Sequence, residues 1–250
     1  MLRLRPPIVK TNGLQMKSVV ILQSNYIPWK GYFDLIHDAD LFIFLDDVQY
    51  TKNDWRHRNK IKTSKGVEWL SVPAGERTDR LICEVELSDS SWQAKHWRTL
   101  VQNYSRSPYF EHYRPLFEPL YMQTAWDSLS QLNQKFVQLI SGELGITTEF
   151  RDSRYYHAEG SKQEKLLNLL YKAGGTRYIS GPAAKDYIDP EKFVSAGIDL
   201  VWKDYSGYPE YPQSFPPFEH GVTVLDLLFN VGPSAPDYIW GWRTAEKKLR

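Results

Sequence analysis

Short apolar runs alternate with helix-spaced apolar positions along most of this chain. Residues 19–22 form the first run, and residues 41–45 form a second, unbroken run that is typical of strands buried on both faces of a parallel sheet. Between the two runs, apolar side chains recur at helical spacing at Tyr32, Leu35, Ile36 and Ala39. The pattern therefore predicts a compact strand, helix and strand unit.

The alternation continues toward the C-terminus after a largely helical middle section. Later strands are predicted at 147–150, 177–180 and 198–202, with helices between them. Ser161 and Glu164 fit a capping box at the start of one of these helices. Residues 56–62 and 68–72 flank a turn signal, so we expect a hairpin whose antiparallel strands extend the sheet.

These elements indicate an α/β fold. We expect a Rossmann-like, mixed, mainly parallel sheet with flanking helices and a mostly helical insertion at about 90–145. Residues 1–15 carry charge and two prolines, so we expect a disordered N-terminal extension before a single domain over 16–250.

The composition is that of an ordinary globular protein. With 31 basic and 30 acidic residues, the net charge of +1 gives no global field for nucleic acid or an anionic membrane. The single cysteine, Cys83, excludes an internal disulfide framework, and its alternating surroundings at 81–87 predict a strand with an inert thiol. The sequence lacks an apolar run of about 20 residues and a secretory signal pattern, so we expect a cytoplasmic protein without membrane insertion.

Polar residues follow both N-terminal strands. Gln23 and Asn25 lie in a turn before the helix, where free backbone N–H groups suit phosphate or carboxylate binding, although a purely structural turn explains them equally well. Asp46 and Asp47 come directly after the second apolar run, a position for acids that bind a sugar hydroxyl, a divalent cation or a transferred proton. Neighbouring strand residues point to opposite faces, so one of the two is expected to serve a site.

Cations recur at every second position in the following segment. The four are Arg56, Arg58, Lys60 and Lys62. On one face of a strand they could neutralise a diphosphate through charge-assisted hydrogen bonds. The alternative is a solvated edge strand whose charges prevent aggregation. The opposite face of such a strand would carry Trp55, His57 and Asn59.

Two further residues are candidates for chemistry. His220 lies beside Glu219, which could hold it as a general base, although a surface histidine is the competing interpretation. Lys185 follows a predicted strand in the loop 180–187, where it could bind an anion or only connect two elements. The histidines are scattered without metal-ligand spacing, so no metal site is predicted. Phosphate-loop, dinucleotide-binding and nucleophile-elbow motifs are absent from the sequence.

Several separated blocks agree in order and spacing with one known family. The first is Gln-x-x-Tyr-x-Pro-Trp-x-Gly-Tyr-Phe from Gln23, and later blocks are Asp46-Asp47-Val48-Gln49-Tyr50, Trp55 to Ile61, Trp69 to Pro73 and Tyr178 to Gly181. Over residues 17–230 the chain resembles the WbqC-like proteins of bacterial O-antigen and surface-polysaccharide clusters. One departure is Leu22-Gln23-Ser24, where the family commonly has Gln-Pro, often preceded by His.

The resemblance implies a transferase that acylates or aminoacylates, for example with glycine, a nucleotide-linked amino sugar. In that interpretation Asp46 or Asp47 orients or deprotonates the sugar amine. Further candidates bind substrate: Gln23, Asn25, Tyr26, Trp29, Gln49, Tyr50, Arg56, Arg58, Asn59, Lys60 and Lys185. If the histidine that often precedes Gln-Pro in the family were the general base, this chain would lack that base.

The acyl or aminoacyl donor is expected to be a co-substrate, with tRNA as one carrier, rather than a permanently bound cofactor. Two alternatives stay open from the residues alone. One is a non-catalytic protein that binds a nucleotide-sugar or glycan, and the other is a metal-dependent nucleotidyltransferase-like enzyme.

Overall fold

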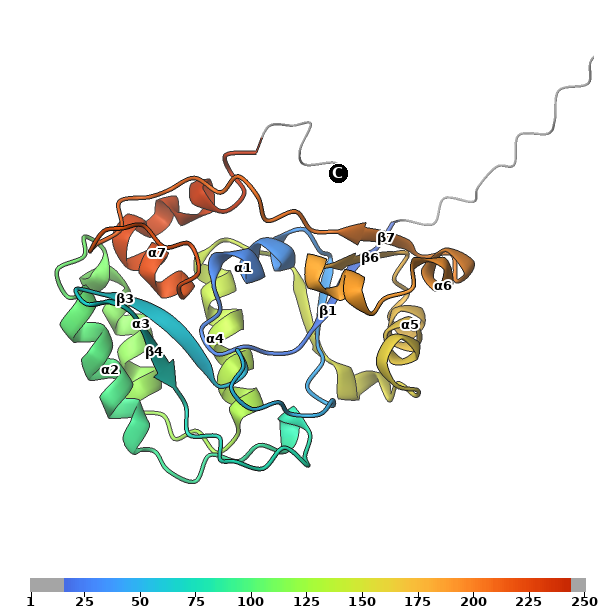
Figure 1. Cartoon of the computed structure of the whole chain (residues 1–250), viewed down its shortest axis with the longest axis horizontal. Helices are drawn as coiled ribbons and strands as arrows, with labels where there is room; N and C mark the ends of the chain where they lie inside the picture. Colours follow the sequence, from blue (N-terminus) through green and yellow to red (C-terminus); the bar gives the residue numbers. More distant parts are fainter. Residues whose placement is uncertain (1–15, 244–250) are drawn as a thin grey trace, which may run out of the picture.

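The computed structural model describes residues 16–243, so the predicted N-terminal extension 1–15 and the last residues of the predicted domain lie outside the described residues. Its main sheet has five parallel strands in the order β5-β2-β1-β6-β7, of which β1, β6 and β7 are labelled in Figure 1. The strands are β1 (Ser18–Leu22), β2 (Leu41–Phe44), β5 (Glu149–Asp152), β6 (Arg177–Ser180) and β7 (Asp199–Trp202). The α/β prediction is confirmed, with a mainly parallel sheet and flanking helices.

Strand alternation divides the apolar side chains between two cores. Val20 and Phe42 point into a large core with α1 and α4, whereas Val19 and Leu41 point into a smaller core with α5 and α6. The sheet is therefore covered by helices on both faces, as its unbroken apolar strands require. The helices flanking the sheet are α1 (Lys30–His37), α4 (Leu129–Glu143), α5 (Lys162–Ala173) and α6 (Pro190–Ser195).

The helical middle section contains one helix with two prolines in its interior, where proline normally argues against a helix. Besides α2 (Ser91–Tyr104), the chain forms α3 (Phe110–Met122) with Pro115 and Pro119 inside it. Its buried aromatic face, which includes Phe110 and Phe117, packs into the large core. Burial of this face outweighs the backbone hydrogen bonds that proline cannot donate. The last α-helix, α7 (Val224–Val231), is buried along its whole length in the same core.

The predicted hairpin exists but does not extend the main sheet. Strands β3 (Arg58–Thr63) and β4 (Gly66–Ser71) form a separate antiparallel pair. Ile61 and Leu70 are buried in the large core, and the backbone N–H of Lys62 donates to the Tyr104 hydroxyl of α2 at 2.9 Å. The expected extension was wrong because the hairpin's apolar face packs on helices instead.

Two local predictions were also wrong. Cys83 lies in a short 3-10 helix (Ile82–Glu84) rather than a strand, because the Glu84 carboxylate accepts the backbone N–H of Leu81 at 2.8 Å and closes a turn. Ser161 precedes α5 as expected, but its side chain makes no capping hydrogen bond. Within residues 16–243, none of the helices has the length and apolar character needed to cross a membrane.

Lys30 is a buried cation at the start of α1. Its Nζ lies 5.0 Å from the Tyr208 ring centroid and 5.3 Å from that of Tyr211, and it donates to the Pro209 carbonyl at 3.3 Å. Burial lowers the pKa of Lys30 from 10.5 to about 8, although the nearby Asp226 carboxylate partly opposes the change. The charged form is therefore less favourable in the folded chain than in water.

This lowered pKa predicts a pH-dependent stability. Below pH 8 Lys30 is charged in both the folded and the unfolded chain, so folding carries the full free-energy cost of burying the charge. Between about pH 8 and 10.5 Lys30 loses its proton only in the folded chain, so this cost decreases as the pH rises. We expect Lys30→Met to gain stability relative to wild type below pH 8 and to lose this advantage toward pH 10. Denaturant unfolding from pH 7 to 10 measures it. For Lys192→Met, at an exposed position of α6, the difference in unfolding free energy from wild type should not change with pH. The same pH-independent difference for Lys30→Met would contradict the expectation.

Candidate functional site

A cavity of about 920 Å³ lies at the carboxyl ends of β1, β2 and β6. Leu22, Leu45 and Ser180, which end or follow these strands, belong to its lining. In the sheet, β1 lies between β2 and β6, and the chain passes first to one side of β1 and later to the other. This reversal is the topological switch point at which open α/β sheets bind ligands.

The lining combines aromatic rings, amides and an excess of positive charge. Its charged residues are three cations and one carboxylate: Arg56, Lys162, Lys165 and Asp47. Its aromatic rings come from Trp29, Tyr32, Trp55, Tyr178, Tyr187 and Tyr205. A cavity of this size with a few charged groups and many rings suits a small anionic molecule that also has flat or hydroxyl-bearing parts.

Asp47 supplies the carboxylate in the cavity lining, and it forms an ion pair with Lys165 of α5. The Lys165 ammonium lies 2.7 Å from one carboxylate oxygen and also donates to the Asp47 carbonyl at 2.9 Å. The Ser153 hydroxyl donates to the other carboxylate oxygen at 2.5 Å. Each carboxylate oxygen has two lone pairs, so both can still accept a hydrogen bond from a ligand.

Arg56 lies at the cavity just before β3. One guanidinium nitrogen contacts the Asp54 carboxylate at 3.1 Å, and Asn133 donates to the Arg56 carbonyl at 2.7 Å. The buried Nε of Arg56 and the buried Oδ1 of Asn25 have no hydrogen-bond partner within residues 16–243. Both atoms are themselves buried, although their residues belong to the cavity lining.

Six of the predicted site residues line the cavity together. They are Gln23, Asn25, Trp29, Asp47, Gln49 and Arg56. Most come from the turn after β1 and the loop after β2, so these two strand ends line the same cavity. The Trp29 ring packs edge-to-face against Tyr205, with centroids 5.2 Å apart.

Asp46 does not line the cavity. Its carboxylate is fully buried and accepts the backbone N–H of Ser24 at 2.9 Å, the Ser130 hydroxyl at 2.5 Å and the Gln134 amide at 3.0 Å. The residue thus joins the first turn to α4. Ser24 has a structural role of its own here, because a proline at that position would have no N–H to donate.

Three further candidates are buried elsewhere. The Tyr26 hydroxyl bonds with His96 at 2.9 Å and Tyr121 at 2.7 Å in the large core. The Tyr50 hydroxyl bonds with the His57 ring at 2.9 Å. The Asn59 amide donates to the carbonyls of Tyr26 and Ile27 at 3.1 and 3.0 Å, so it fixes the first turn.

Lys185 and His220 also lie outside the cavity lining. The Lys185 ammonium is 5.7 Å from the Trp202 ring centroid. The His220 ring packs edge-to-face on Phe218, and the Glu219 carboxylate accepts the N–H of Gly221 at 2.8 Å instead of holding the imidazole. Burial and the nearby Lys30 charge lower the pKa of His220.

Three of the four alternating cations share a face of β3, and Arg56 does not. Arg56 points to the cavity before the strand begins, whereas Arg58 and Lys60 lie on the hairpin against Trp69. Lys62 is buried and donates to the Pro217 carbonyl. The alternation holds for Arg58, Lys60 and Lys62, which lie on one face of β3, but not for Arg56, because the strand starts only at Arg58.

Sequence reasoning missed the contribution of α5. The helix begins at the cavity, and Gly160, Ser161, Lys162 and Lys165 line it. The free N–H groups of the first helical turn add to the positive potential there. The Ser161 capping signal located the start of this helix, but nothing in the sequence indicated that it faces the end of β2.

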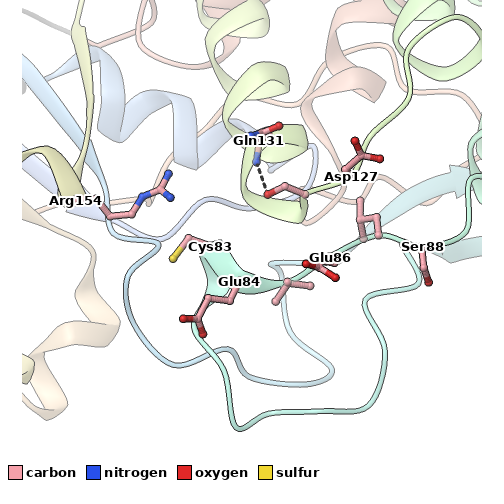
Figure 2. A pocket seen from close by; sticks show the side chains of 10 residues that line it. Cys83, Glu84, Glu86, Ser88, Asp127, Gln131 and Arg154 are labelled. Carbon is pink, nitrogen blue, oxygen red and sulfur yellow. Dashed lines mark hydrogen bonds between the residues drawn. The ribbon is translucent and has the colours of Figure 1, made fainter.

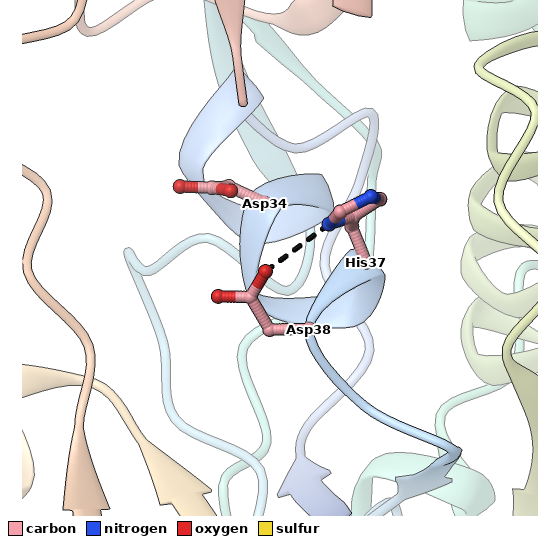
Figure 3. Close-up of side chains that lie close together, drawn as sticks. All are labelled: Asp34, His37 and Asp38. Carbon is pink, nitrogen blue, oxygen red and sulfur yellow. Dashed lines mark hydrogen bonds and ion pairs between the residues drawn. The ribbon is translucent and has the colours of Figure 1, made fainter. Parts of the chain in front are cut away.

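A cluster of three side chains on α1 has the spacing of a metal site. Asp34, His37 and Asp38 lie close together, and His37 bonds with Asp38 at 3.1 Å (Figure 3). However, Lys203 and Arg243 both form ion pairs with the two carboxylates. These cations already neutralise the acids, so the cluster is a buried ion-pair network rather than a metal-ion site.

A second pocket, of about 550 Å³, lies beside the 3-10 helix and contains Cys83 and Arg154 (Figure 2). The Nε of Arg154 forms an ion pair with an Asp152 carboxylate oxygen at 2.8 Å. Burial raises the pKa of the Cys83 thiol, which disfavours the nucleophilic thiolate. This pocket therefore lacks an activated nucleophile.

Comparison with known proteins agrees with the resemblance seen in the sequence. The chain is 45% identical over 226 residues to an uncharacterized protein, Rv1507c, of Mycobacterium tuberculosis, and the match covers 90% of this chain and 98% of that protein. No solved structure matches the chain. Residues 23–238 match the WbqC-like protein family, and this range includes every residue of the cavity except Ile21 and Leu22. The chain belongs to the WbqC-like protein family.

Proposed function

We propose that this protein transfers an acyl or aminoacyl group to the amine of a nucleotide-linked amino sugar bound in the cavity. Membership of the WbqC-like family suggests a role in polysaccharide biosynthesis. The observation that carries the proposal is the charge of the cavity, with three cations and one carboxylate at the switch point of the sheet. This arrangement suits a ligand with a diphosphate and a sugar.

The cations are divided between two tasks. Lys165 neutralises Asp47, so Lys162 and the part of the Arg56 guanidinium that does not contact Asp54 are left for the diphosphate, together with the free N–H groups at the start of α5. Guanidinium groups bind phosphate oxygens through paired hydrogen bonds, and Arg56 brings such a group to the cavity lining.

Asp47 accepts the proton in the proposed reaction. The sugar amine attacks the carbonyl carbon of the donor, a C–N bond forms, the bond to the donor's carrier breaks, and the amine proton passes to Asp47. The Asn25 side chain in the cavity lining supplies an amide for a hydrogen bond with the sugar, which fixes the orientation of the sugar. Gln23 and Gln49 supply further amide groups at the same cavity.

The donor is a co-substrate, either an acyl thioester, an aminoacyl-tRNA or another activated amino acid. The proposal includes no permanently bound cofactor and places the reaction in the cytoplasm, where nucleotide-linked sugars and such donors meet.

A second candidate is a non-catalytic protein that binds a nucleotide-sugar. The specific observation in its favour is that both oxygens of Asp47 already bond to Lys165 and Ser153, which suits an orienting role without proton transfer. Metal-dependent nucleotidyl transfer is less well supported, because the Asp46 carboxylate accepts from Ser130 and Gln134 outside the cavity lining and the Asp47 carboxylate pairs with Lys165.

Ligand binding tests the proposal directly. We expect UDP- and dTDP-linked amino sugars to raise the melting temperature by mass action. Arg56→Gln should weaken their binding about 10- to 100-fold, because charge-assisted hydrogen bonds contribute about 1.5–3 kcal/mol. Titration calorimetry measures the Kd. Arg98→Gln, at an exposed position of α2, is the matched control and should bind normally. Failure of every nucleotide-sugar to bind, or normal binding by Arg56→Gln, would contradict the proposal.

A further inference from the structure

Two exposed tryptophans lie side by side, Trp55 in the turn before β3 and Trp69 on β4. Trp55 is 42% and Trp69 is 43% exposed, and their ring centroids are 5.4 Å apart. Trp55 also lines the cavity, whereas Trp69 does not. A pair of large aromatic faces open to solvent is uncommon on a protein surface without a binding role, because burial of such rings is favourable.

Two cations lie against these rings. Lys60 pairs directly with Trp69 across the hairpin, and its ammonium is 5.3 Å from the Trp69 ring centroid and 5.9 Å from that of Trp55. The Arg58 guanidinium carbon is 4.3 Å from the Trp69 ring centroid. The remaining side-chain contacts of Arg58 are with Asn53.

These charges are available to a ligand. Neither Arg58 nor Lys60 forms a salt bridge with a carboxylate of the described chain, in contrast to Lys165 in the cavity. Flat rings beside unpaired cations are the combination with which proteins bind nucleobases and their phosphates. The surface is continuous with the cavity through Trp55, and Arg56 follows it directly in the chain.

We propose that Trp55, Trp69, Arg58 and Lys60 form the nucleotide-binding platform of this protein. The inference rests on the proposed function and extends it: the sugar occupies the cavity, the diphosphate reaches from Lys162 and Arg56 toward Arg58 and Lys60, and the base stacks on the exposed tryptophan faces. Because stacking uses the face that every base has, the platform tolerates different bases. Recognition of the substrate then depends mainly on its phosphates and its sugar.

Titration calorimetry with UDP, GDP and inorganic pyrophosphate tests the platform. Trp69→Ala should weaken both nucleotides about tenfold or more and leave pyrophosphate unchanged, because stacking on one base contributes about 1–3 kcal/mol. Trp69→Phe, which keeps a ring, should restore much of the loss. Arg58→Gln should weaken all three ligands. Tyr171→Ala removes another exposed ring, on α5, and should change none of them.

The outcomes separate this inference from the proposed function. Unchanged nucleotide binding by Trp69→Ala, or an equal loss for pyrophosphate, overturns the platform. If Arg56→Gln still weakens nucleotide-sugars in that case, the cavity proposal stands alone. Thermal unfolding of each variant shows whether it is folded, and the comparison of ligands within one variant does not depend on its stability.

Discussion

Asp47→Asn is expected to lower the rate of acyl transfer by about 10²- to 10⁴-fold, which is the usual contribution of a positioned general base. Asparagine has the shape of aspartate and keeps an oxygen for the Ser153 hydroxyl, but it cannot take a proton from the sugar amine. Binding should change much less than turnover, since Arg56 and Lys162 remain. Chromatography of the acylated nucleotide-sugar gives kcat, and calorimetry gives the Kd.

Asp46→Asn is the matched control at the neighbouring position. It removes a charged acceptor from Ser24, Ser130 and Gln134, so we expect lower stability and a nearly normal kcat per folded molecule. Near-normal turnover by Asp47→Asn, with ligand bound, would remove this residue from the mechanism. An Asp47→Asn variant that binds normally, together with a wild type that transfers nothing across all donor classes, would instead favour the non-catalytic binding protein.

Much of the fold could be predicted from local patterns. The runs at β1 and β2 are short and wholly apolar, and such runs need cover on both faces, so a parallel sheet between helices follows from few residues. The position of the site followed in turn, because the carboxyl ends of adjacent parallel strands meet at one edge. Gln23, Asn25 and Asp47 were therefore predictable as neighbours before any contact was known.

Contacts between distant segments could not be predicted in the same way. Lys165 is 118 residues from Asp47 in the sequence, and only the packing of α5 on the sheet brings them together. Similarly, Arg56 and Lys62 appeared to share a strand face, but alternation applies only within a strand. Arg56 precedes β3, and Lys62 is drawn inward to the Pro217 carbonyl.

The buried ion-pair network on α1 also depends on distant segments. Asp34 is fully buried and accepts the Tyr208 hydroxyl at 2.5 Å, and its other oxygen lies 3.0 Å from the Lys203 ammonium. Arg243, near the end of the described chain, pairs with the same carboxylate. With Asp38 the network holds two carboxylates and two cations, so its charges balance. The network ties β7 and the C-terminal segment to the helix that follows the first turn of the site.

Asp34→Asn is expected to lower the free energy of unfolding by about 3–5 kcal/mol, because Lys203 and Arg243 would then share the single carboxylate of Asp38 and one buried positive charge would be uncompensated. The matched control is Asp199→Asn, which removes a half-exposed partner of Arg177 and should cost about 0–1 kcal/mol. The double variant Asp34→Leu/Lys203→Met removes one charge of each sign, so it should recover much of the loss. Denaturant unfolding at pH 7 measures all three. If Asp34→Asn were no more destabilising than Asp199→Asn, the network would not be a buried, balanced set of charges.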